Sequence, residues 1–193
     1  MASNSLDEYT ITSLLIQGGP IDIFGVGERL ITSKSDPVFG AVYKIASIEK
    51  DGMWEPRIKI SESVEKITNP GLKKVYRVYN DKGRAIADLL TLLREVPDTE
   101  EPYRYIDPEQ PWRELYFENC TFKEMKQLII KDGKLVVDLP TLEEIRAYVQ
   151  DQLANEIWPE EQRFENPHRH YLDMSPSYYQ LKMDLLNRIY RKK

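Results

Sequence analysis

The sequence predicts an α/β fold in which a strand–helix–strand start is followed by β-hairpins and a helical C-terminal extension. Three observations support this prediction. First, an amphipathic segment leads into a short apolar run over residues 21–24. Second, stretches of alternating apolar and polar residues, separated by turn residues, follow from position 51. Third, helix-capping residues stand at Thr141 and Ser175. We expect three regions, over residues 1–50, 51–95 and 96–193.

The first region begins with a predicted helix over residues 6–17, because apolar side chains recur there at helical spacing. Ser5 and Glu8 form an S-x-x-E capping box at its start, and the sequence Gly-Gly-Pro over residues 18–20 ends it. A helix cap so close to the first residue leads us to expect a piece of a longer protein.

Two strands are expected after this helix, over residues 21–24 and 40–50. A strand, a helix and a strand at this spacing are typical of a parallel α/β arrangement in which a further strand precedes Ser3. The first region is therefore predicted to be the last piece of such an arrangement.

The second region is predicted to consist of hairpins. Apolar and polar residues alternate over 56–62, which predicts a strand. The sequence Asn-Pro-Gly over residues 69–71 predicts a turn. Residues 73–93 are interpreted as two strands joined by a turn at 80–83, although the periodicity of residues 84–93 would also fit a short helix.

The third region opens with a proline-rich, acidic stretch over residues 96–112, which predicts a loop without a packed element of its own. Residues 127–140 predict a hairpin that turns at Asp132-Gly133. Two helices follow, over residues 141–158 from a Thr141–Glu144 capping box and over residues 175–190 from Ser175 and a first-turn proline.

The composition excludes several classes of function. The net charge of −5, without a basic stripe, argues against nucleic-acid binding. No apolar run approaches the roughly 20 residues of a membrane span, and no signal-peptide pattern is visible in the given sequence. The single cysteine, Cys120, forms no internal disulfide, which suits a reducing cytoplasm, and we assign it no nucleophilic role.

The strongest candidate for a binding site is the loop that follows the apolar run, with Gly25 and Gly27. Glycine lets a phosphate approach backbone amides that no Cβ shields. Arg29, Lys34 and nearby Thr and Ser hydroxyls would supply charge and hydrogen bonds to such a phosphate. The alternative is a tight strand-to-loop turn that binds no ligand.

A second candidate is the His-x-His pair at His168 and His170, which on a strand could ligate a metal. Pro167 disrupts a regular strand there, and the spacing of the sequence marks no third ligand, so a turn with hydrogen-bonded histidines is the favoured interpretation. The acidic residues lie mostly at caps and on helix surfaces. We therefore assign no metal ligand and no catalytic residue in this chain.

Four stretches, ASNSLDEYTI, IDIFGVGERLITSKSDPVFGAVYKI, KITNPGLKKVYR and ENPHRHYLDMS, resemble the nicotinate phosphoribosyltransferase family in its C-terminal part. The resemblance covers essentially the whole chain. Two positions depart from the family pattern: Glu28 stands where many members have Thr, and Ala41 where a second glycine usually precedes Val-Tyr-Lys.

The resemblance implies the last strand–helix–strand units of a type II phosphoribosyltransferase α/β barrel, followed by hairpins and a helical extension. It also implies a reaction of nicotinate with phosphoribosyl pyrophosphate, in NAD biosynthesis, that gives nicotinate mononucleotide and pyrophosphate and is coupled to ATP hydrolysis. The residues that it implies for binding the substrate's 5′-phosphate are Gly25, Val26, Gly27, Glu28, Ser3 and Asn4, with Arg29 and Lys34 as secondary contacts.

The same resemblance implies that the family's catalytic groups precede Met1, so that this chain alone is expected to be inactive. The expected partners are the missing N-terminal portion and a second copy in a homodimer. ATP and Mg²⁺ would serve the full-length enzyme and not bind this chain alone. The rival hypothesis is a non-enzymatic binding or assembly module that retains the glycine loop.

Overall fold

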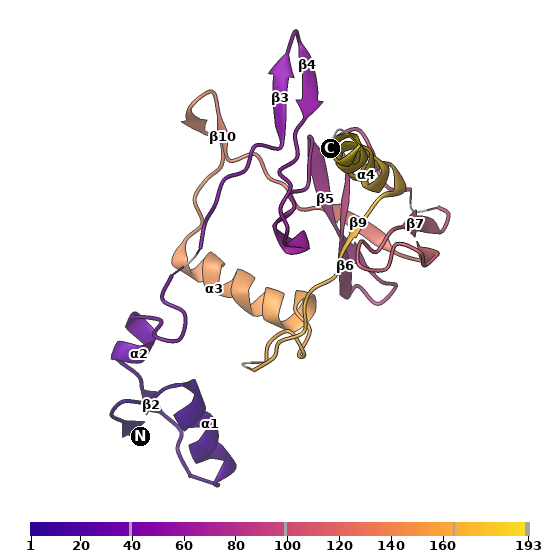
Figure 1. Cartoon of the computed structure of the whole chain (residues 1–193). Helices are drawn as coiled ribbons and strands as arrows, with labels where there is room; N and C mark the ends of the chain where they lie inside the picture. Colours follow the sequence, from indigo (N-terminus) through magenta and orange to yellow (C-terminus); the bar gives the residue numbers. More distant parts are fainter. Residues whose placement is uncertain (39, 99, 164, 192–193) are drawn as a thin grey trace. The chain divides into compact units, whose positions relative to one another are not determined.

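The computed structural model describes residues 1–38, 40–98, 100–163 and 165–191 of the chain. The chain divides into two compact units, Met1–Tyr43 and Lys44–Lys193. Figure 1 shows the elements of both units along the chain.

The first unit has the order β1 (Ala2–Ser3), α1 (Glu8–Ile16), β2 (Phe24–Gly25) and α2 (Glu28–Ile31). Strands β1 and β2 pair in parallel, with Ala2 opposite Phe24 and Ser3 opposite Gly25. The predicted parallel strand–helix–strand arrangement, with a strand that ends near Ser3, is therefore present in the first unit.

Three local predictions in this part of the chain were wrong. Helix α1 begins after Asp7, whose Oδ1 accepts a hydrogen bond from the Thr10 amide at 2.8 Å, and not after Ser5. Ser5 cannot cap the helix because it lies in the left-handed region, at φ 51°. The strand expected over 21–24 is reduced to Phe24–Gly25, and of the strand expected over 40–50 only Ser47–Lys50 forms. Phe39 lies outside the described residues.

The first unit has almost no core of its own. Among its described residues only Leu6 is buried, and helix α1 has no buried residue. Large apolar side chains on both helices and beside β2 are exposed, namely Tyr9, Leu15, Ile16, Ile23, Leu30 and Ile31. A βαβ unit becomes stable by burying the apolar faces of its helix and strands, and this unit buries neither face.

The second unit is built on a four-stranded sheet in the order β12 (Leu172–Met174), β6 (Ala85–Leu92), β5 (Lys73–Tyr79) and β9 (Thr121–Glu124). Strands β5 and β6 form an antiparallel hairpin, in which Asn80 Oδ1 accepts from the amides of Lys82 and Arg84. Gly83, at φ 72°, completes the turn. This turn chemistry favours a strand over residues 84–93, which is what the structure contains.

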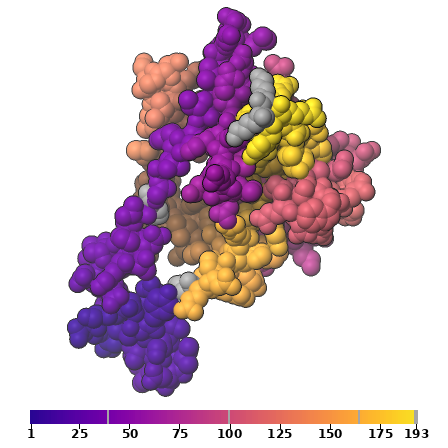
Figure 2. Space-filling model, viewed as in Figure 1, coloured from indigo at the N-terminus to yellow at the C-terminus, as the bar shows by residue number. Residues whose placement is uncertain are grey.

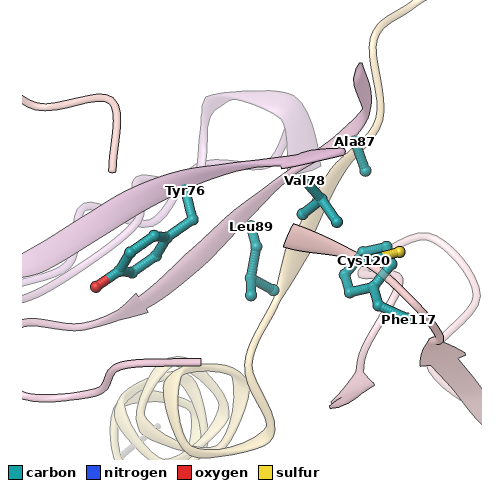
Figure 3. Close-up of a cluster of buried hydrophobic side chains, with 6 residues drawn as sticks. All are labelled: Tyr76, Val78, Ala87, Leu89, Phe117 and Cys120. Atoms are coloured by element: carbon teal, nitrogen blue, oxygen red, sulfur yellow. The ribbon is translucent and has the colours of Figure 1, made fainter. Parts of the chain in front are cut away.

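The two faces of the sheet carry different cores. Tyr76, Val78, Ala87 and Leu89 point to one face, where they pack with Phe117 and Cys120 (Figure 3). On the other face Leu90 and Met174 pack against Tyr178 of helix α4 (Pro176–Tyr190). The hydroxyl of Tyr178 donates to the Pro70 carbonyl at 2.8 Å, so this buried tyrosine is satisfied.

The remaining elements are hairpins and a second helix. The hairpins are β3 (Ser47–Lys50) with β4 (Met53–Pro56), β7 (Tyr103–Tyr105) with β8 (Leu115–Phe117), and β10 (Ile130–Lys131) with β11 (Lys134–Leu135). A 3₁₀ turn spans Val64–Lys66, and helix α3 (Leu142–Asp151) continues into a π-helical turn over Gln152–Glu156. Figure 2 shows the region around β10 as a lobe at the surface, coloured salmon.

The turn at Asp132-Gly133, the Thr141–Glu144 capping box and the Ser175 cap are confirmed. The strand predicted over 56–62 is wrong, since β4 ends at Pro56. The stretch 96–112 was predicted to lack a packed element, but it contains β7, whose Tyr105 ring stacks on Phe117 at 3.9 Å.

The central sheet draws β5 and β6 from the predicted region 51–95, and β9 and β12 from the predicted region 96–193. The division into three regions stays a prediction. Within the described residues, no helix has the length and apolar character needed to cross a membrane.

Candidate functional site

The glycine loop follows the carboxyl end of β2, at the same edge as the end of β1. Ser3 lies opposite Gly25 in the parallel pair. A Cβ added at Gly25 would lie 3.2 Å from the Cβ of Ser3 and 3.6 Å from the Cε of Met1. The close approach of the two strands therefore disfavours a side chain at Gly25.

Gly27 differs from Gly25 in its surroundings. A Cβ added at Gly27 would meet no described atom within 4 Å. Gly27 is the N-cap residue of α2, and its carbonyl accepts from the amides of Leu30 and Ile31 at 3.1 Å each. No neighbour in the described part of the chain thus requires a glycine here, and the space beside the backbone is open.

The other predicted phosphate-binding residues lie around the same edge. Asn4 directly follows β1 at φ 88°, so the chain turns sharply after the strand, and the side chains of Ser3 and Asn4 are exposed. Val26 links the two glycines and is half-buried, whereas Glu28 is exposed in the first turn of α2. The structure thus brings Ser3, Asn4 and residues 25–28 together.

The two predicted secondary contacts have different positions. Arg29 Nη1 pairs with Asp7 Oδ2 at 3.2 Å, which ties the start of α2 to the start of α1. The hydrogen bond from Thr10 and then the charge of Arg29 hold the pKa of Asp7 below its ordinary value. Lys34 is exposed in the turn after α2, and the Thr32 hydroxyl donates to the Glu28 carbonyl at 2.7 Å.

A second polar cluster, which the sequence interpretation missed, lies in the second unit. Arg77 on β5 makes a bidentate pair with Asp88 on β6, with Nε–Oδ1 at 2.9 Å and Nη2–Oδ2 at 3.2 Å. Its Nη1 also reaches Glu156 Oε2 at 3.3 Å, and the Tyr79 hydroxyl donates to Glu156 at 2.7 Å. We name this group, together with His170, the Arg77 cluster.

His170 joins the Arg77 cluster from the segment before β12. Its Nδ1 lies 2.9 Å from Glu161 Oε1, and its Nε2 lies 3.5 Å from Asp88 Oδ1. The Asp88 carboxylate raises the pKa of His170, although burial opposes this shift. His170 therefore lies between two carboxylates, while the ring of His168 packs edge-on against Tyr171 at 5.3 Å.

This arrangement favours the structural interpretation of the two histidines. In the described ranges no three His, Cys, Asp or Glu side chains are grouped so that they could hold a metal ion. Cys120 is likewise buried, where its thiol donates to the Glu118 carbonyl at 3.2 Å, and burial raises its pKa. The contacts of the Arg77 cluster hold Glu156 and His170 against strands β5 and β6, which is a structural role.

Asp173 in β12 is a buried acidic residue, and burial disfavours the ionised form of its carboxyl group. Its residue is only 6% exposed, and burial, with a smaller contribution from Asp107, raises its pKa to about 7. Because the unfolded-state pKa is about 3.9, the unfolded chain ionises first as the pH rises from about 4 to 7. Ionisation of Asp173 therefore lowers the stability of the fold over this range.

The variant Asp173→Asn tests this prediction. It removes the ionisation but keeps the shape, so we expect it to be more stable than the wild type at pH 8 by about 1–2 kcal/mol, a range reduced for solvent screening. At pH 4 the advantage should vanish. Urea unfolding at the two pH values measures the difference, and an equal difference at both would contradict the prediction.

Comparison with known proteins shows one family to which the chain is similar. Residues 72–182 match the model of the nicotinate phosphoribosyltransferase C-terminal domain. The chain is 36% identical to nicotinate phosphoribosyltransferase of Bacillus subtilis over 98% of this chain and 39% of that protein. It is 35% identical to the enzyme of the same name from Caenorhabditis elegans, over 93% of this chain and 32% of that protein.

The fold has a match among solved structures. The crystal structure of human nicotinic acid phosphoribosyltransferase superposes with a TM-score of 0.70 at 23% identity, over 95% of this chain and 32% of that chain. The mixed α/β arrangement of the chain is thus found within a known structure. The chain spans less than half the length of each of these relatives.

Proposed function

The chain belongs to the nicotinate phosphoribosyltransferase family, and from this premise we propose that it is the C-terminal part of an enzyme of NAD biosynthesis. The complete enzyme would join nicotinate to phosphoribosyl pyrophosphate, release pyrophosphate and form nicotinate mononucleotide, with ATP hydrolysis coupled to the reaction. The part of the enzyme represented here would hold the 5′-phosphate of the ribosyl group.

The observation that supports this proposal is the open space at Gly27. The close approach of Ser3 disfavours a side chain at Gly25, whereas no atom of the described part of the chain occupies the space where a side chain at residue 27 would lie. A phosphate could lie in this space, because a glycine leaves the backbone amides of the loop open to close approach by phosphate oxygens.

In this proposal the amides of Gly25, Val26, Gly27 and Glu28 face the phosphate, and the polar side chains of Ser3 and Asn4 contribute from the neighbouring strand end. Arg29 acts at a distance by its ion pair with Asp7, which fixes the start of α2. Lys34 would add positive charge at the edge of the site.

The proposal requires the rest of the enzyme. The first unit buries only Leu6 among its described residues, so it depends on the remainder of a barrel for its core. We propose that the catalytic groups lie in the upstream portion and that the complete enzyme is a cytoplasmic homodimer. ATP and Mg²⁺ would bind that enzyme; since the described residues of this chain offer no metal-ligating cluster, we assign them no role in holding Mg²⁺.

A reconstitution experiment tests the proposal. The chain is mixed with the portion of the Bacillus subtilis relative that precedes the matched region, and formation of nicotinate mononucleotide is measured with nicotinate, phosphoribosyl pyrophosphate and ATP. We expect activity in the mixture and none in either part alone. Activity of the chain alone would contradict the assignment of catalytic groups upstream, and inactivity of a folded, bound mixture would favour the non-enzymatic binding or assembly module.

A further inference from the structure

A cavity of about 550 Å³ lies beside strand β12 in the second unit. Small-molecule sites typically have volumes of about 300–1,000 Å³, so the cavity has the size of a binding site for a small compound. The residues that line it include three aromatic and three acidic ones, namely Tyr105, Phe117, Tyr171, Asp107, Glu118 and Asp173. We name it the Asp173 cavity.

Asp173 faces this cavity from the edge of the central sheet. It lies in β12, the edge strand, opposite Leu89 of β6. The next residue, Met174, packs on the face that helix α4 covers. Because successive residues of a strand point to opposite faces, Asp173 points to the other face, where Leu89 packs with Phe117. A carboxyl group thus stands at the margin of an apolar core.

A second carboxyl group approaches from the segment after β7. Ile106 and Met174 exchange two backbone hydrogen bonds, at 2.8 and 2.9 Å, in an isolated antiparallel bridge. Asp107 and Asp173 stand next to the bridged residues and therefore point to the face opposite to theirs. Burial raises the pKa of Asp173, and the charge of Asp107 adds to this shift, so the two carboxyl groups are close. Like charges at facing positions are destabilising.

The Asp173 carboxyl group has no partner among the described residues. Asp173 is only 6% exposed, yet no described group donates a hydrogen bond to its carboxyl or forms an ion pair with it. The nearby His170 pairs with other carboxylates, and Arg113, which also lines the cavity, is exposed. Buried polar groups are almost always hydrogen-bonded, so a buried carboxyl group that lines a cavity without a partner indicates a ligand.

We propose that the Asp173 cavity binds a small organic cation, an ammonium group attached to an apolar or aromatic body, with Asp173 and Asp107 as its counter-ions. The ammonium group would donate to the Asp173 carboxylate, and the rings of Tyr105 and Tyr171 would contact the cation or its apolar body. The charge of the cavity favours this ligand. Among the described residues that line it, Arg113 is the one cation, against the acids Asp107, Glu118 and Asp173.

A metal ion fits the Asp173 cavity less well. Hard cations such as Ca²⁺ and Mg²⁺ take about six or more oxygen ligands. Within the described ranges, no three His, Cys, Asp or Glu side chains are placed so that they could hold a metal ion, and aromatic rings form part of the walls. The inference does not depend on the proposed function, because the glycine loop belongs to the first unit and the Asp173 cavity to the second.

A titration of the chain with three small compounds tests the inference. Benzylamine carries the ammonium group, benzyl alcohol is its neutral analogue, and benzoate is an anionic analogue. Each compound is added to the isotope-labelled chain at about pH 8, where the Asp173 carboxyl group, with a pKa of about 7, and the amine are both mostly charged. The dissociation constant is taken from the NMR shifts of the backbone amides of residues 105–107 and 171–174.

We expect benzylamine to bind about 10–100-fold more tightly than benzyl alcohol, and benzoate to leave these amides unshifted. Asp173→Asn should weaken the binding of benzylamine by a similar factor. This variant is expected to be more stable than the wild type at this pH, so unfolding cannot account for the loss. The control Glu143→Gln removes one charge from an exposed position on α3 and should bind benzylamine as the wild type does.

Three results would overturn the inference. Equal affinities for benzylamine and benzyl alcohol would show that the cavity does not select a positive charge. Equal affinities of the wild type and Asp173→Asn for benzylamine would show that Asp173 is not the counter-ion. The absence of any shift at about 10 mM benzylamine would show that the chain has no such site. None of these results depends on the formation of nicotinate mononucleotide, so the proposed function is tested separately.

Discussion

Replacing Gly27 by valine is expected to lower the kcat/KM of the reconstituted enzyme for phosphoribosyl pyrophosphate by about 100-fold or more, since a displacement of the reacting group by about 1 Å is enough for such a loss. The Cβ of residue 27 would enter open space, so the chain itself should fold and bind the upstream portion as before. The branched side chain would then occupy the space proposed for the 5′-phosphate.

Two alanine substitutions are expected to differ from Gly27→Val in the size or the kind of their effect. Gly27→Ala adds a single methyl group in the same space and should cause a smaller loss than valine. Gly25→Ala brings its methyl group to 3.2 Å from the Ser3 Cβ, so it should disturb the strand pair and weaken assembly as well as activity. A Gly27→Val enzyme with wild-type KM and kcat would show that the loop does not hold the phosphate.

Much of the local structure could be predicted because its signals lie within a few residues. The capping box at Thr141, the cap at Ser175 and the turns at Asn80–Gly83 and Asp132-Gly133 each depend on the chemistry of one to four adjacent side chains. Ser5 was chosen wrongly because Asp7, two residues later, is an equally good cap. Only the left-handed backbone at Ser5 decides between them, and no sequence rule predicts it.

Long-range pairing could not be predicted in the same way. Strand β12 has three residues and pairs in parallel with β6, far away in the sequence, at Leu172–Asp88 through Met174–Leu90. Three residues are too few for a periodic signal. The mixed α/β class nevertheless agrees with the structure, because hairpins and helices each have strong local signals.

The candidate site was predicted in part for the same reasons. Two glycines directly after an apolar run mark the glycine loop in the sequence. The family resemblance implied that Ser3 belongs to the same site. The Arg77 cluster was missed, although one signal was present: Arg77 and Asp88 are opposite charges at facing positions of a hairpin. Glu156 and His170 arrive from a distant segment, and nothing in their spacing indicates that they meet there.

Replacing Arg77 by methionine is expected to lower the free energy of unfolding at pH 7 by about 3 kcal/mol, at the low end of the range for breaking a buried ion pair. The side chains of Arg77, Asp88 and Glu156 are only 18%, 17% and 9% exposed, so the variant leaves two carboxylates without their cation. Urea unfolding followed by fluorescence of Trp158, whose Nε1 donates to the Ala85 carbonyl beside the cluster, measures the loss.

Arg57→Met provides the matched control, because Arg57 pairs with Glu55 at the surface, where the side chains are 44% and 42% exposed. An exposed pair of this kind contributes less than about 1 kcal/mol, so this variant should unfold nearly as the wild type does. Equal losses in the two variants would mean that the Arg77 cluster contributes no more than a surface pair.

The loss caused by Arg77→Met should also change with pH. Burial alone would raise the pKa of Asp88, but the neighbouring His170 and Arg77 side chains lower it below the ordinary value. Asp88 thus adds to the free energy of unfolding above about pH 4, and this stabilisation is lost as the pH falls through its lowered pKa. His170, with a raised pKa, contributes below about pH 6.5 and loses this contribution as the pH rises through its folded-state value.

In the variant, protonated His170 is the only remaining cation of the cluster. The difference in stability between wild type and Arg77→Met should therefore be smallest where the pH lies below the lowered pKa of Asp88, intermediate near about pH 6, and largest above the pKa of His170. A series of urea unfolding curves from about pH 8.5 through about pH 6 down to about pH 2.5 samples the three regimes. A difference that stays constant across them would show that the packing of the Arg77 side chain, and not its charge, holds Glu156 and His170 against the sheet.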